Sequence, residues 1–291
     1  MRKQFVKTIE KILDEDKNTV LLLGDIGVFG FRESFKKYPE RVYNIGILEQ
    51  SSVSLASGLS MIGLNPIFHT IAPFLVERSL EQLKVDFGYQ NLNGNFFSIG
   101  SSYDYAALGC THHCPGDISQ LLTIPNMEII TPGTSEELNL LIGEAYVSGF
   151  PTYYRLSEYE NEESQLVKFK KGNVIKEGKM GTIICFGNTL HNTIKATEDL
   201  DVTILYYTTV NPFDDTLLID NFNEKIIVVE PWYEGSVNYK ISKCLENKSY
   251  KLFNIGVPHK FLLNYGTKLE HDNLYGLDII GLKNKFKKWL E

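Results

Sequence analysis

Two cysteines and two histidines lie within one five-residue segment, Cys110-Thr111-His112-His113-Cys114. Thiolates and imidazoles are donors that zinc prefers, but structural zinc sites join two pairs of ligands that are separated in sequence. Four donors in so short a segment can hardly converge on one ion. The spacing therefore favours a loop with two small buried thiols, or a loop histidine that faces a bound ligand, over a metal site.

Glu49 is a carboxylate whose neighbours allow acid–base chemistry. It follows the apolar residues Ile47 and Leu48, so its side chain can be partly removed from water. A carboxyl group in such a place can exchange a proton with a reacting group. A glutamate in the first turn of a helix is also stabilised by the helix dipole. The residues alone leave both interpretations open.

The segment after Glu49 is rich in small side chains, which allow two helices to approach closely. These are Ser51, Ser52, Ser54, Ala56, Ser57, Gly58 and Ser60. The helix either packs tightly within its own domain or forms a contact between subunits.

Two glycine-containing segments resemble nucleotide-binding motifs only in part. Gly24–Gly30 follows an apolar run, but its glycines recur every third residue, whereas a dinucleotide site needs G-x-G-x-x-G. Gly172–Lys179 is one residue too long for a P-loop, and Met180 cannot supply the hydroxyl that binds magnesium. The sequence also has no G-x-S-x-G nucleophile motif. These patterns argue against the common nucleotide-binding and hydrolase folds.

Hydrophobic periodicity predicts alternating helices and strands in the first half of the chain. Apolar residues at helical spacing predict helices over residues 3–14 and 75–88. Continuous apolar runs predict strands at 19–23 and 95–99. Thr134 and Glu137 form a capping-box pattern that predicts the start of a further helix.

The second half repeats this alternation. Three short apolar runs are typical of strands that are buried on both faces of a parallel sheet: Thr182–Cys185, Val202–Leu205 and Ile226–Val229. The polar stretch 158–165 is the best candidate for a linker. We therefore expect an α/β protein with two domains, 1–157 and 166–291, each a mostly parallel sheet flanked by helices.

Composition indicates a globular chain rather than a disordered or membrane-spanning one. The 291 residues are 43% hydrophobic and 22% charged, which is normal for a protein with a sizeable core. The net charge of −7 argues against nucleic acid or an anionic membrane as the main partner. Four cysteines are too few for a disulfide scaffold. The short apolar runs and the N-terminal segment without a signal-peptide core predict a cytoplasmic location.

A more specific pattern lies in residues 39–58. Pro39-Glu40-Arg41, Gly46-Ile47-Leu48-Glu49-Gln50 and Ala56-x-Gly58 resemble the pyrimidine-binding domain of the transketolase family, which includes deoxyxylulose phosphate synthases and the β subunits of 2-oxo acid dehydrogenases. Further matches follow in family order: Phe74 with Arg78, Gly109-x-Thr111-His112, Ile124-Pro125-Asn126, Thr131-Pro132, Asn211–Asp214, Glu230 to Gly235, and Ile255–Pro258. The chain thus resembles the C-terminal half of a transketolase, a pyrimidine-binding domain followed by the C-terminal domain.

The resemblance implies a cofactor and a set of site residues. The family uses thiamine diphosphate, and a carboxyl group hydrogen-bonded to N1′ of its pyrimidine promotes the tautomer that activates it. By this resemblance the catalytic residues are Glu49 and His112. The residues implied in cofactor binding are Glu49, Phe74, Asp25, Ile47 and Arg78, and those implied in substrate binding are His112, His113 and Arg155.

Three of these assignments have a simpler alternative. Asp25 is equally an ordinary turn residue at the end of a strand. His113 is either a second substrate contact or a plain loop residue. Arg155 either binds substrate or pairs with a carboxylate of the core.

The resemblance also implies a partner. The family holds the cofactor's diphosphate in a second domain, through Mg²⁺ (or Ca²⁺) and a Gly-Asp-Gly motif, and these residues contain no Gly-Asp-Gly. We expect an N-terminal diphosphate-binding transketolase subunit as partner in an α2β2 assembly. We also expect self-association through the small-residue helix after Glu49.

The expected reaction is transfer of a two-carbon ketol unit from a ketose to an aldehyde. Acyl transfer, by a 2-oxo acid dehydrogenase β subunit or a deoxyxylulose-phosphate-synthase-like enzyme, is the enzymatic alternative, and a non-catalytic scaffold subunit is the other. Glu158, Gly100-Ser101 and Leu108 stand where relatives carry an arginine, a basic residue or histidine, and an aspartate. A carboxylate repels a phosphate, so these departures predict an acceptor without a terminal phosphate at that position, such as a modified or nucleotide-linked sugar.

Overall fold

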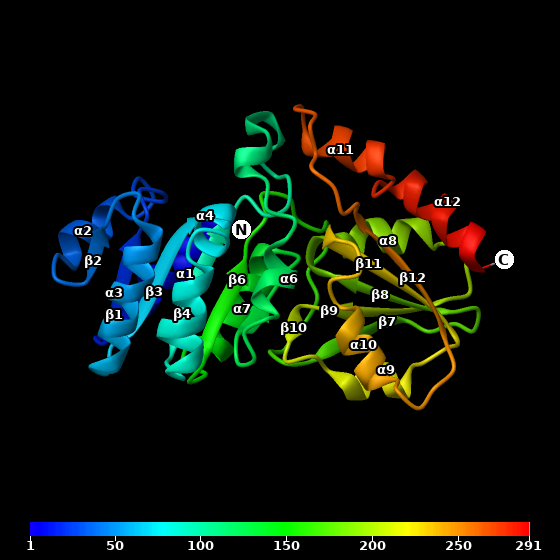
Figure 1. Ribbon diagram of the computed structural model, residues 1–291, viewed down its shortest axis with the longest axis horizontal. Coiled ribbons are helices and arrows are strands. Elements are labelled where there is room, and N and C mark those ends of the chain that lie inside the picture. Colours follow the sequence, from blue (N-terminus) through cyan, green and yellow to red (C-terminus); the bar gives the residue numbers. More distant parts are fainter. Residues whose placement is uncertain (291) are drawn as a thin grey trace.

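Two sheets stand side by side in the computed structural model, which describes residues 1–290, and helices cover both (Figure 1). The first sheet has seven strands in the order β10-β5-β6-β4-β3-β1-β2, and the second has five in the order β12-β11-β8-β9-β7. All neighbouring strands are parallel except the pairs β10–β5 and β7–β9. The predicted α/β class with mostly parallel sheets is confirmed.

The first half of the chain builds six strands of the seven-stranded sheet. They are β1 (Thr19–Leu23), β2 (Val42–Asn44), β3 (Asn65–Ile71), β4 (Gly94–Ile99), β5 (Glu128–Ile130) and β6 (Pro151–Arg155). The helices of this half are α1 (Arg2–Glu15), α2 (Arg32–Lys37), α3 (Glu49–Met61), α4 (Ala72–Val76), α5 (Leu80–Gln82), α6 (Asp117–Leu121) and α7 (Ser135–Ala145). The predicted helix at 3–14 and the strands at 19–23 and 95–99 are confirmed.

The prediction of one continuous helix over 75–88 is wrong. After α4 the chain turns at Ser79, whose φ of −116° and ψ of 22° are not helical. Its hydroxyl donates to the carbonyl of Leu75 at 2.9 Å, a bond that competes with the helical pattern. The chain resumes as α5 and as a π-helix, Leu83–Tyr89. The apolar residues of this segment, Val76, Leu80, Leu83 and Phe87, are buried or partly buried. Their spacing therefore predicted burial correctly, but not an unbroken helix.

The predicted cap at Thr134 forms, and its Glu137 also joins α7 to the second sheet. The Thr134 hydroxyl accepts a hydrogen bond from the amide of Glu137 at 3.2 Å. The buried Glu137 carboxylate accepts from the amide of Gly133 at 2.7 Å and from the hydroxyl of Tyr206, in the second sheet, at 2.7 Å. Burial raises the pKa of Glu137. The residue that completes the helix cap, Glu137, therefore also makes a long-range contact with Tyr206.

The second half builds the five-stranded sheet. Its strands are β7 (Gly172–Lys176), β8 (Thr182–Phe186), β9 (Thr203–Tyr207), β11 (Lys225–Tyr233) and β12 (Lys251–Val257). Its helices are α8 (Leu190–Ala196), α9 (Asp215–Asp220), α10 (Asn238–Cys244), α11 (Lys268–Tyr275) and α12 (Ile279–Leu290). The three predicted apolar strands are confirmed as β8, β9 and β11, of which β11 extends beyond the predicted run. Among the described residues, no helix is long and apolar enough to cross a membrane.

One strand of the second half crosses to the first sheet. β10 (Thr209–Asn211) pairs antiparallel with β5, and Asn211 donates to the carbonyl of Met127 at 2.6 Å. The connection 158–165 has no helix or strand. Its Asn161 is nevertheless buried, donating to the carbonyls of Gly133 and Gly187. The two halves are thus joined by more than a linker.

A buried ion pair lies where the two sheets meet. Arg155, at the end of β6, donates through Nε to Asp117 Oδ2 at 2.7 Å, and the two side chains are 3% and 0% exposed. Arg155 also donates to the carbonyl of Pro231 in the second half, at 3.2 Å. The hydroxyl of Tyr153 donates to the same Asp117 oxygen at 3.0 Å. The pair thus joins β6, α6 and the end of β11.

Removal of the carboxylate charge should strongly destabilise the fold. We expect Asp117→Asn to lower the free energy of unfolding by about 3–5 kcal/mol, because the Arg155 charge stays buried without a partner. Urea unfolding measures the change in midpoint. As a control, Asp199→Asn breaks exposed contacts with Lys283 and Lys287 and should leave the midpoint nearly unchanged. Equal midpoints for both variants would contradict the prediction.

Candidate cofactor-binding site

Glu49 begins α3 with its side chain only 2% exposed. Its Oε2 accepts a hydrogen bond from Arg78 Nη1 at 3.1 Å. Its Oε1 is buried and has no hydrogen-bond partner among the described residues. A buried carboxylate oxygen without a partner is costly, so the site suits a ligand that brings a donor to this oxygen.

Arg78, Phe74 and His112 continue from Glu49 as one series of contacts. The Arg78 guanidinium lies 3.9 Å from the centre of the Phe74 ring, a cation–π geometry. The Phe74 ring meets the His112 ring edge to face, with centroids 5.4 Å apart. Four of the residues predicted from the sequence are therefore brought together.

The parallel sheet explains this convergence. Glu49 follows the end of β2, Phe74 and Arg78 follow the end of β3, and His112 lies in the long loop after β4. The carboxyl ends of parallel strands meet at one edge of a sheet, where ligands of α/β proteins commonly bind.

Asp25 follows the end of β1 and is tied to the loop that leads to Glu49. Its amide donates to Asn44 Oδ1 at 3.1 Å, and Asn44 Nδ2 donates back to Asp25 Oδ1 at 3.0 Å. The amide of Gly46 also donates to Asn44 Oδ1, at 3.1 Å. Ile47 is 64% exposed in the same loop. Asn44 is a positioning residue that the sequence reasoning missed, because an asparagine before a glycine turn carries no specific signal.

His113 and Arg155 have different surroundings from the Glu49 series. His113 is 5% exposed, and its ring meets the ring of His271 edge to face at 5.8 Å. Burial, with a contribution from His271, lowers its pKa. Arg155 pairs with Asp117, as in the simpler of its two interpretations. The roles of His113 and Arg155 in substrate binding stay predictions.

The two cysteines of the His112 loop differ in environment. Cys110 is exposed, whereas Cys114 is buried and lies 3.7 Å from Glu77 Oε1. Burial raises the pKa of the Cys114 thiol well above its usual value. Within residues 1–290, no three histidine, cysteine, aspartate or glutamate side chains gather closely enough to hold a metal ion.

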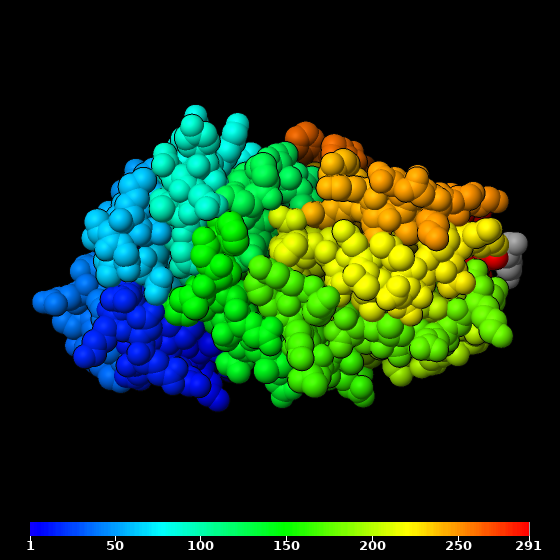
Figure 2. All heavy atoms as spheres, turned by 90° about the horizontal axis from the view of Figure 1, so that it is seen from below, coloured from blue at the N-terminus to red at the C-terminus, as the bar shows by residue number. Residues whose placement is uncertain are grey.

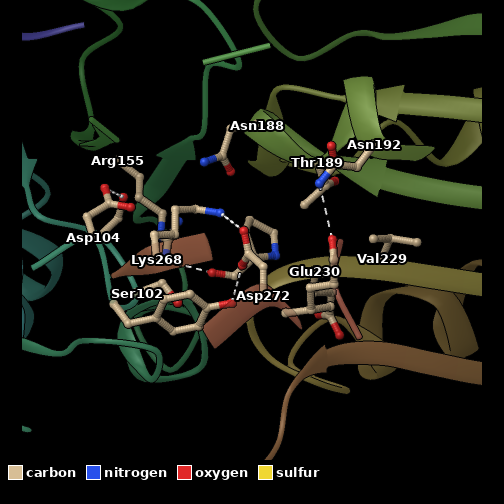
Figure 3. Close-up of a pocket in the computed structure, with 14 residues that line it drawn as sticks. Ser102, Asp104, Arg155, Asn188, Thr189, Asn192, Val229, Glu230, Lys268 and Asp272 are labelled. Carbon is tan, nitrogen blue, oxygen red and sulfur yellow. Dashed lines mark hydrogen bonds and ion pairs between the residues drawn. The ribbon is translucent and has the colours of Figure 1, made fainter. Parts of the chain in front are cut away.

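A polar pocket lies between the two halves, behind Arg155 (Figure 3). Lys268 Nζ lies 2.5 Å from Asp272 Oδ2, and the hydroxyl of Tyr103 donates to Asp272 Oδ1 at 2.6 Å. The remaining cavity is about 30 Å³, close to the volume of one water molecule in the liquid. The Lys268–Asp272 pair occupies much of this pocket, and the remaining space is too small for a sugar.

Glu230 lines the same pocket and organises the turn that follows β11. Its carboxylate accepts from Trp232 Nε1 at 2.8 Å and from the amides of Gly235 and Val237 at 2.5 and 3.2 Å. Burial raises its pKa to about 7. The glutamate of the Glu230–Gly235 motif therefore fixes the backbone of the turn at residues 235–237.

Comparison with known proteins identifies the fold's relatives. Residues 1–162 match the family described as "Transketolase, pyrimidine binding domain". The chain belongs to the transketolase family. It is 35% identical to an uncharacterized 33.6 kDa protein of the fasciation locus of Rhodococcoides fascians, over 98% of this chain and 93% of that protein. It is 28% identical to one of the subunits of the apulose-4-phosphate transketolase of Phocaeicola vulgatus, over 97% and 94%.

Longer members of the transketolase family match over part of their length. The 1-deoxy-D-xylulose-5-phosphate synthase of Psychromonas ingrahamii is 30% identical over 86% of this chain but only 42% of the synthase. Two solved structures share the fold. A split-gene transketolase, described as an inactive β4 tetramer, has a TM-score of 0.87 at 23% identity, covering 99% of this chain and 97% of that one. The transketolase of Campylobacter jejuni has a TM-score of 0.82 at 15% identity, covering 99% and 46%.

These matches confirm the predicted resemblance to the C-terminal part of a transketolase. They also show that relatives of about the same length as this chain occur as separate subunits. The chain spans less than half of the synthase and of the Campylobacter transketolase, and nearly all of the two shorter relatives and the split-gene chain. Thiamine diphosphate is the cofactor implied by membership of the transketolase family.

Asp104, which lines the polar pocket, predicts a pH dependence of stability. Burial raises its pKa from 3.8 to about 6, so the folded chain holds this proton more tightly than the unfolded chain. The resulting stabilisation is present below about pH 4 and is lost as the pH rises to about 6. We expect Asp104→Asn, which retains an acceptor for the Glu158 amide, to unfold with a flatter pH profile between pH 4 and 6.

Urea midpoints measured across this range test the effect of Asp104. The Asp199→Asn variant serves as a control, because neighbouring lysines lower the pKa of the exposed Asp199 to about 2, outside the range. The same slope for the wild type and for Asp104→Asn would show that Asp104 is not the titrating group.

Proposed function

We propose that this chain is the C-terminal (β) subunit of a split, thiamine-diphosphate-dependent transketolase-like enzyme. It would transfer a two-carbon ketol unit from a ketose to an aldehyde. The observation that carries the proposal is the buried Glu49 carboxylate, which has one oxygen held by Arg78 and the other without a partner among the described residues.

The residues present fit the pyrimidine end of thiamine diphosphate. A ring nitrogen that carries a proton would satisfy the free Oε1 of Glu49, and Phe74 offers an aromatic ring beside it. When bound, thiamine diphosphate supplies a nucleophilic carbon that attacks a substrate carbonyl. Exchange of a proton between Glu49 and the pyrimidine would activate the cofactor.

His112 is the candidate for proton movement at the substrate. Its Nδ1 lies 3.0 Å from the hydroxyl of Thr111. This contact favours one orientation of the ring and leaves Nε2 to donate to, or accept a proton from, a substrate oxygen. Its contact with Phe74 keeps it next to the proposed cofactor position. Arg78 is the residue that orients Glu49.

The second half of the cofactor site would come from a partner chain. A relative of the same length is named as one subunit of a transketolase, and the sequence has no Gly-Asp-Gly motif for the metal and the diphosphate. We infer an N-terminal diphosphate-binding partner that holds Mg²⁺ (or Ca²⁺) in a cytoplasmic α2β2 assembly. Residues 1–157 would form the pyrimidine-binding domain and 166–291 the C-terminal domain. The small-residue helix α3, with Leu55 and Met61 exposed on it and Ile62 exposed directly after it, is the proposed surface for self-association.

The acceptor would lack a terminal phosphate next to Glu158, as a modified or nucleotide-linked sugar does. This exposed glutamate stands in the loop after β6, and its amide donates to the buried Asp104. Carboxylates at this position disfavour an anionic group. Acyl transfer of the deoxyxylulose-phosphate-synthase kind is the second candidate, because synthases are among the relatives at 30% identity.

Replacement of Glu49 distinguishes an enzyme from a scaffold subunit. In the complex with its partner, we expect Glu49→Gln to lower ketose consumption at least ~100-fold and to weaken thiamine diphosphate binding, measured by calorimetry with Mg²⁺. The thermal unfolding temperature should change little, because the Arg78 side chain that loses its charged partner is 44% exposed to water. As a matched control, Glu33→Gln changes an exposed glutamate of α2 and should leave both quantities unchanged. Full activity of Glu49→Gln would overturn the proposal in favour of a non-catalytic subunit.

A further inference from the structure

A second cavity lies beside the His112 loop, where the two halves of the chain meet. Six of its lining residues matter here: Glu77, Cys110, His113, Tyr233, Phe261 and Leu262. Figure 1 shows the segment that leads into α11 next to the loop that follows β4, and the Tyr265 ring packs closely over Gly109. Segments far apart in the sequence therefore enclose this cavity.

The position of the cavity connects it to the proposed active site. Cys110 and His113 flank the Thr111-His112 pair, and Glu77 precedes Arg78, which contacts Glu49. The two segments that line this side of the cavity therefore also carry Arg78 and His112 of the proposed active site.

His113 shows that the cavity suits a polar ligand. Its side chain is 5% exposed, and neither ring nitrogen makes a hydrogen bond of normal geometry among the described residues. The backbone of Ala106 is near enough to favour the charged ring, but burial outweighs it and lowers the pKa of His113. Its aromatic neighbour, His271, meets it edge to face, and no hydrogen bond joins the two rings within residues 1–290. A neutral imidazole offers one donor and one acceptor. Two hydroxyl groups satisfy such a ring, one accepting from its N–H and the other donating to its second nitrogen.

Charge and volume restrict the ligand further. Glu77 is the carboxylate that lines the cavity, and no lysine or arginine lines it within residues 1–290. The cavity is about 90 Å³. Since a cavity of about 150 Å³ holds the six carbons of benzene, this space holds roughly four non-hydrogen atoms, as in a –CHOH–CH₂OH group. A phosphorylated end is larger and is repelled by the carboxylate.

We propose that this cavity binds the uncharged, hydroxylated end of the ketose donor and excludes its phosphorylated counterpart; Glu158, which concerns the acceptor, does not line it. His113 and Glu77 would hydrogen-bond the terminal hydroxyls, while Tyr233, Phe261 and Leu262 form the apolar wall. This inference rests on the proposed function, since it identifies the end of the sugar that lies away from the reacting carbonyl. It assigns to His113 a binding role distinct from the role of His112.

Protection of Cys110 from alkylation tests the cavity without any catalytic readout. Cys110 is exposed at its rim, Cys114 and Cys185 are buried, and the half-buried Cys244 lies on α10 as an internal control. The full chain is treated with iodoacetamide, and the labelled peptides are measured by mass spectrometry. We expect saturating D-xylulose to slow labelling of Cys110 at least five-fold. D-Xylulose 5-phosphate should leave it unchanged, and neither sugar should affect Cys244.

A pair of glutamate variants tests the hydrogen bonds. We expect Glu77→Gln to require at least a five-fold higher D-xylulose concentration for the same protection. Glu81→Gln, at an exposed position on α5, should behave as the wild type. Equal protection by both sugars, protection by neither, or an unchanged Glu77→Gln variant would overturn the inference.

The two proposals fail in different ways. Loss of Cys110 protection with intact, Glu49-dependent cofactor binding refutes the sugar subsite alone. Protection of Cys110 by D-xylulose with no cofactor binding in the complex refutes the thiamine-dependent function and leaves a sugar-binding cavity.

Discussion

The buried pair between Arg155 and Asp117 holds both halves of the molecule in place. Asp117 begins α6, only five positions after His112, and Arg155 ends the strand β6 inside the first sheet. The same guanidinium reaches the carbonyl of Pro231 in the second half. A charged pair without solvent must be held in one geometry to offset the loss of hydration. That geometry sets where the His112 loop leaves the first sheet and how the second half lies against it.

The site built on this framework is polar and leaves buried hydrogen-bonding atoms unpartnered among the described residues. Glu49 keeps one buried oxygen unpartnered among residues 1–290, and both nitrogens of His113 are unpartnered there as well. Such groups are rare in folded proteins because each represents a lost hydrogen bond with water. Our proposals explain both by ligands, the cofactor at Glu49 and the substrate at His113. The polar pocket beside Arg155 is the opposite case, because its charged side chains, such as Lys268 and Asp272, have partners and little space remains (Figure 3).

The two halves of the molecule share more structure than a domain boundary suggests. β10 completes the edge of the first sheet, Glu137 accepts from Tyr206, and the connection 158–165 is anchored by Asn161. The space-filling view shows the green and yellow segments of the two halves in continuous contact on that face (Figure 2). Movement of one half against the other would break these buried hydrogen bonds. The connection 158–165 is therefore fixed to both halves.

Local patterns along the chain were enough to predict the fold class, five of the twelve strands in the described residues, and the family motifs that contain Glu49, Phe74, Arg78 and His112. Burial of apolar runs and the spacing of motif residues can be read directly from the order of the amino acids. Folding in three dimensions, in contrast, determines that Ser79 breaks the helix over 75–88, that β10 crosses to the first sheet, and that Arg155 pairs with Asp117. The β10 crossing and the Arg155–Asp117 pair each depend on a partner distant in sequence. The break at Ser79 depends on its hydroxyl competing for the carbonyl of Leu75. The same reason explains why Asn44 and the cavity at His113 were not foreseen, because their chemistry arises from neighbours that only the folded chain supplies.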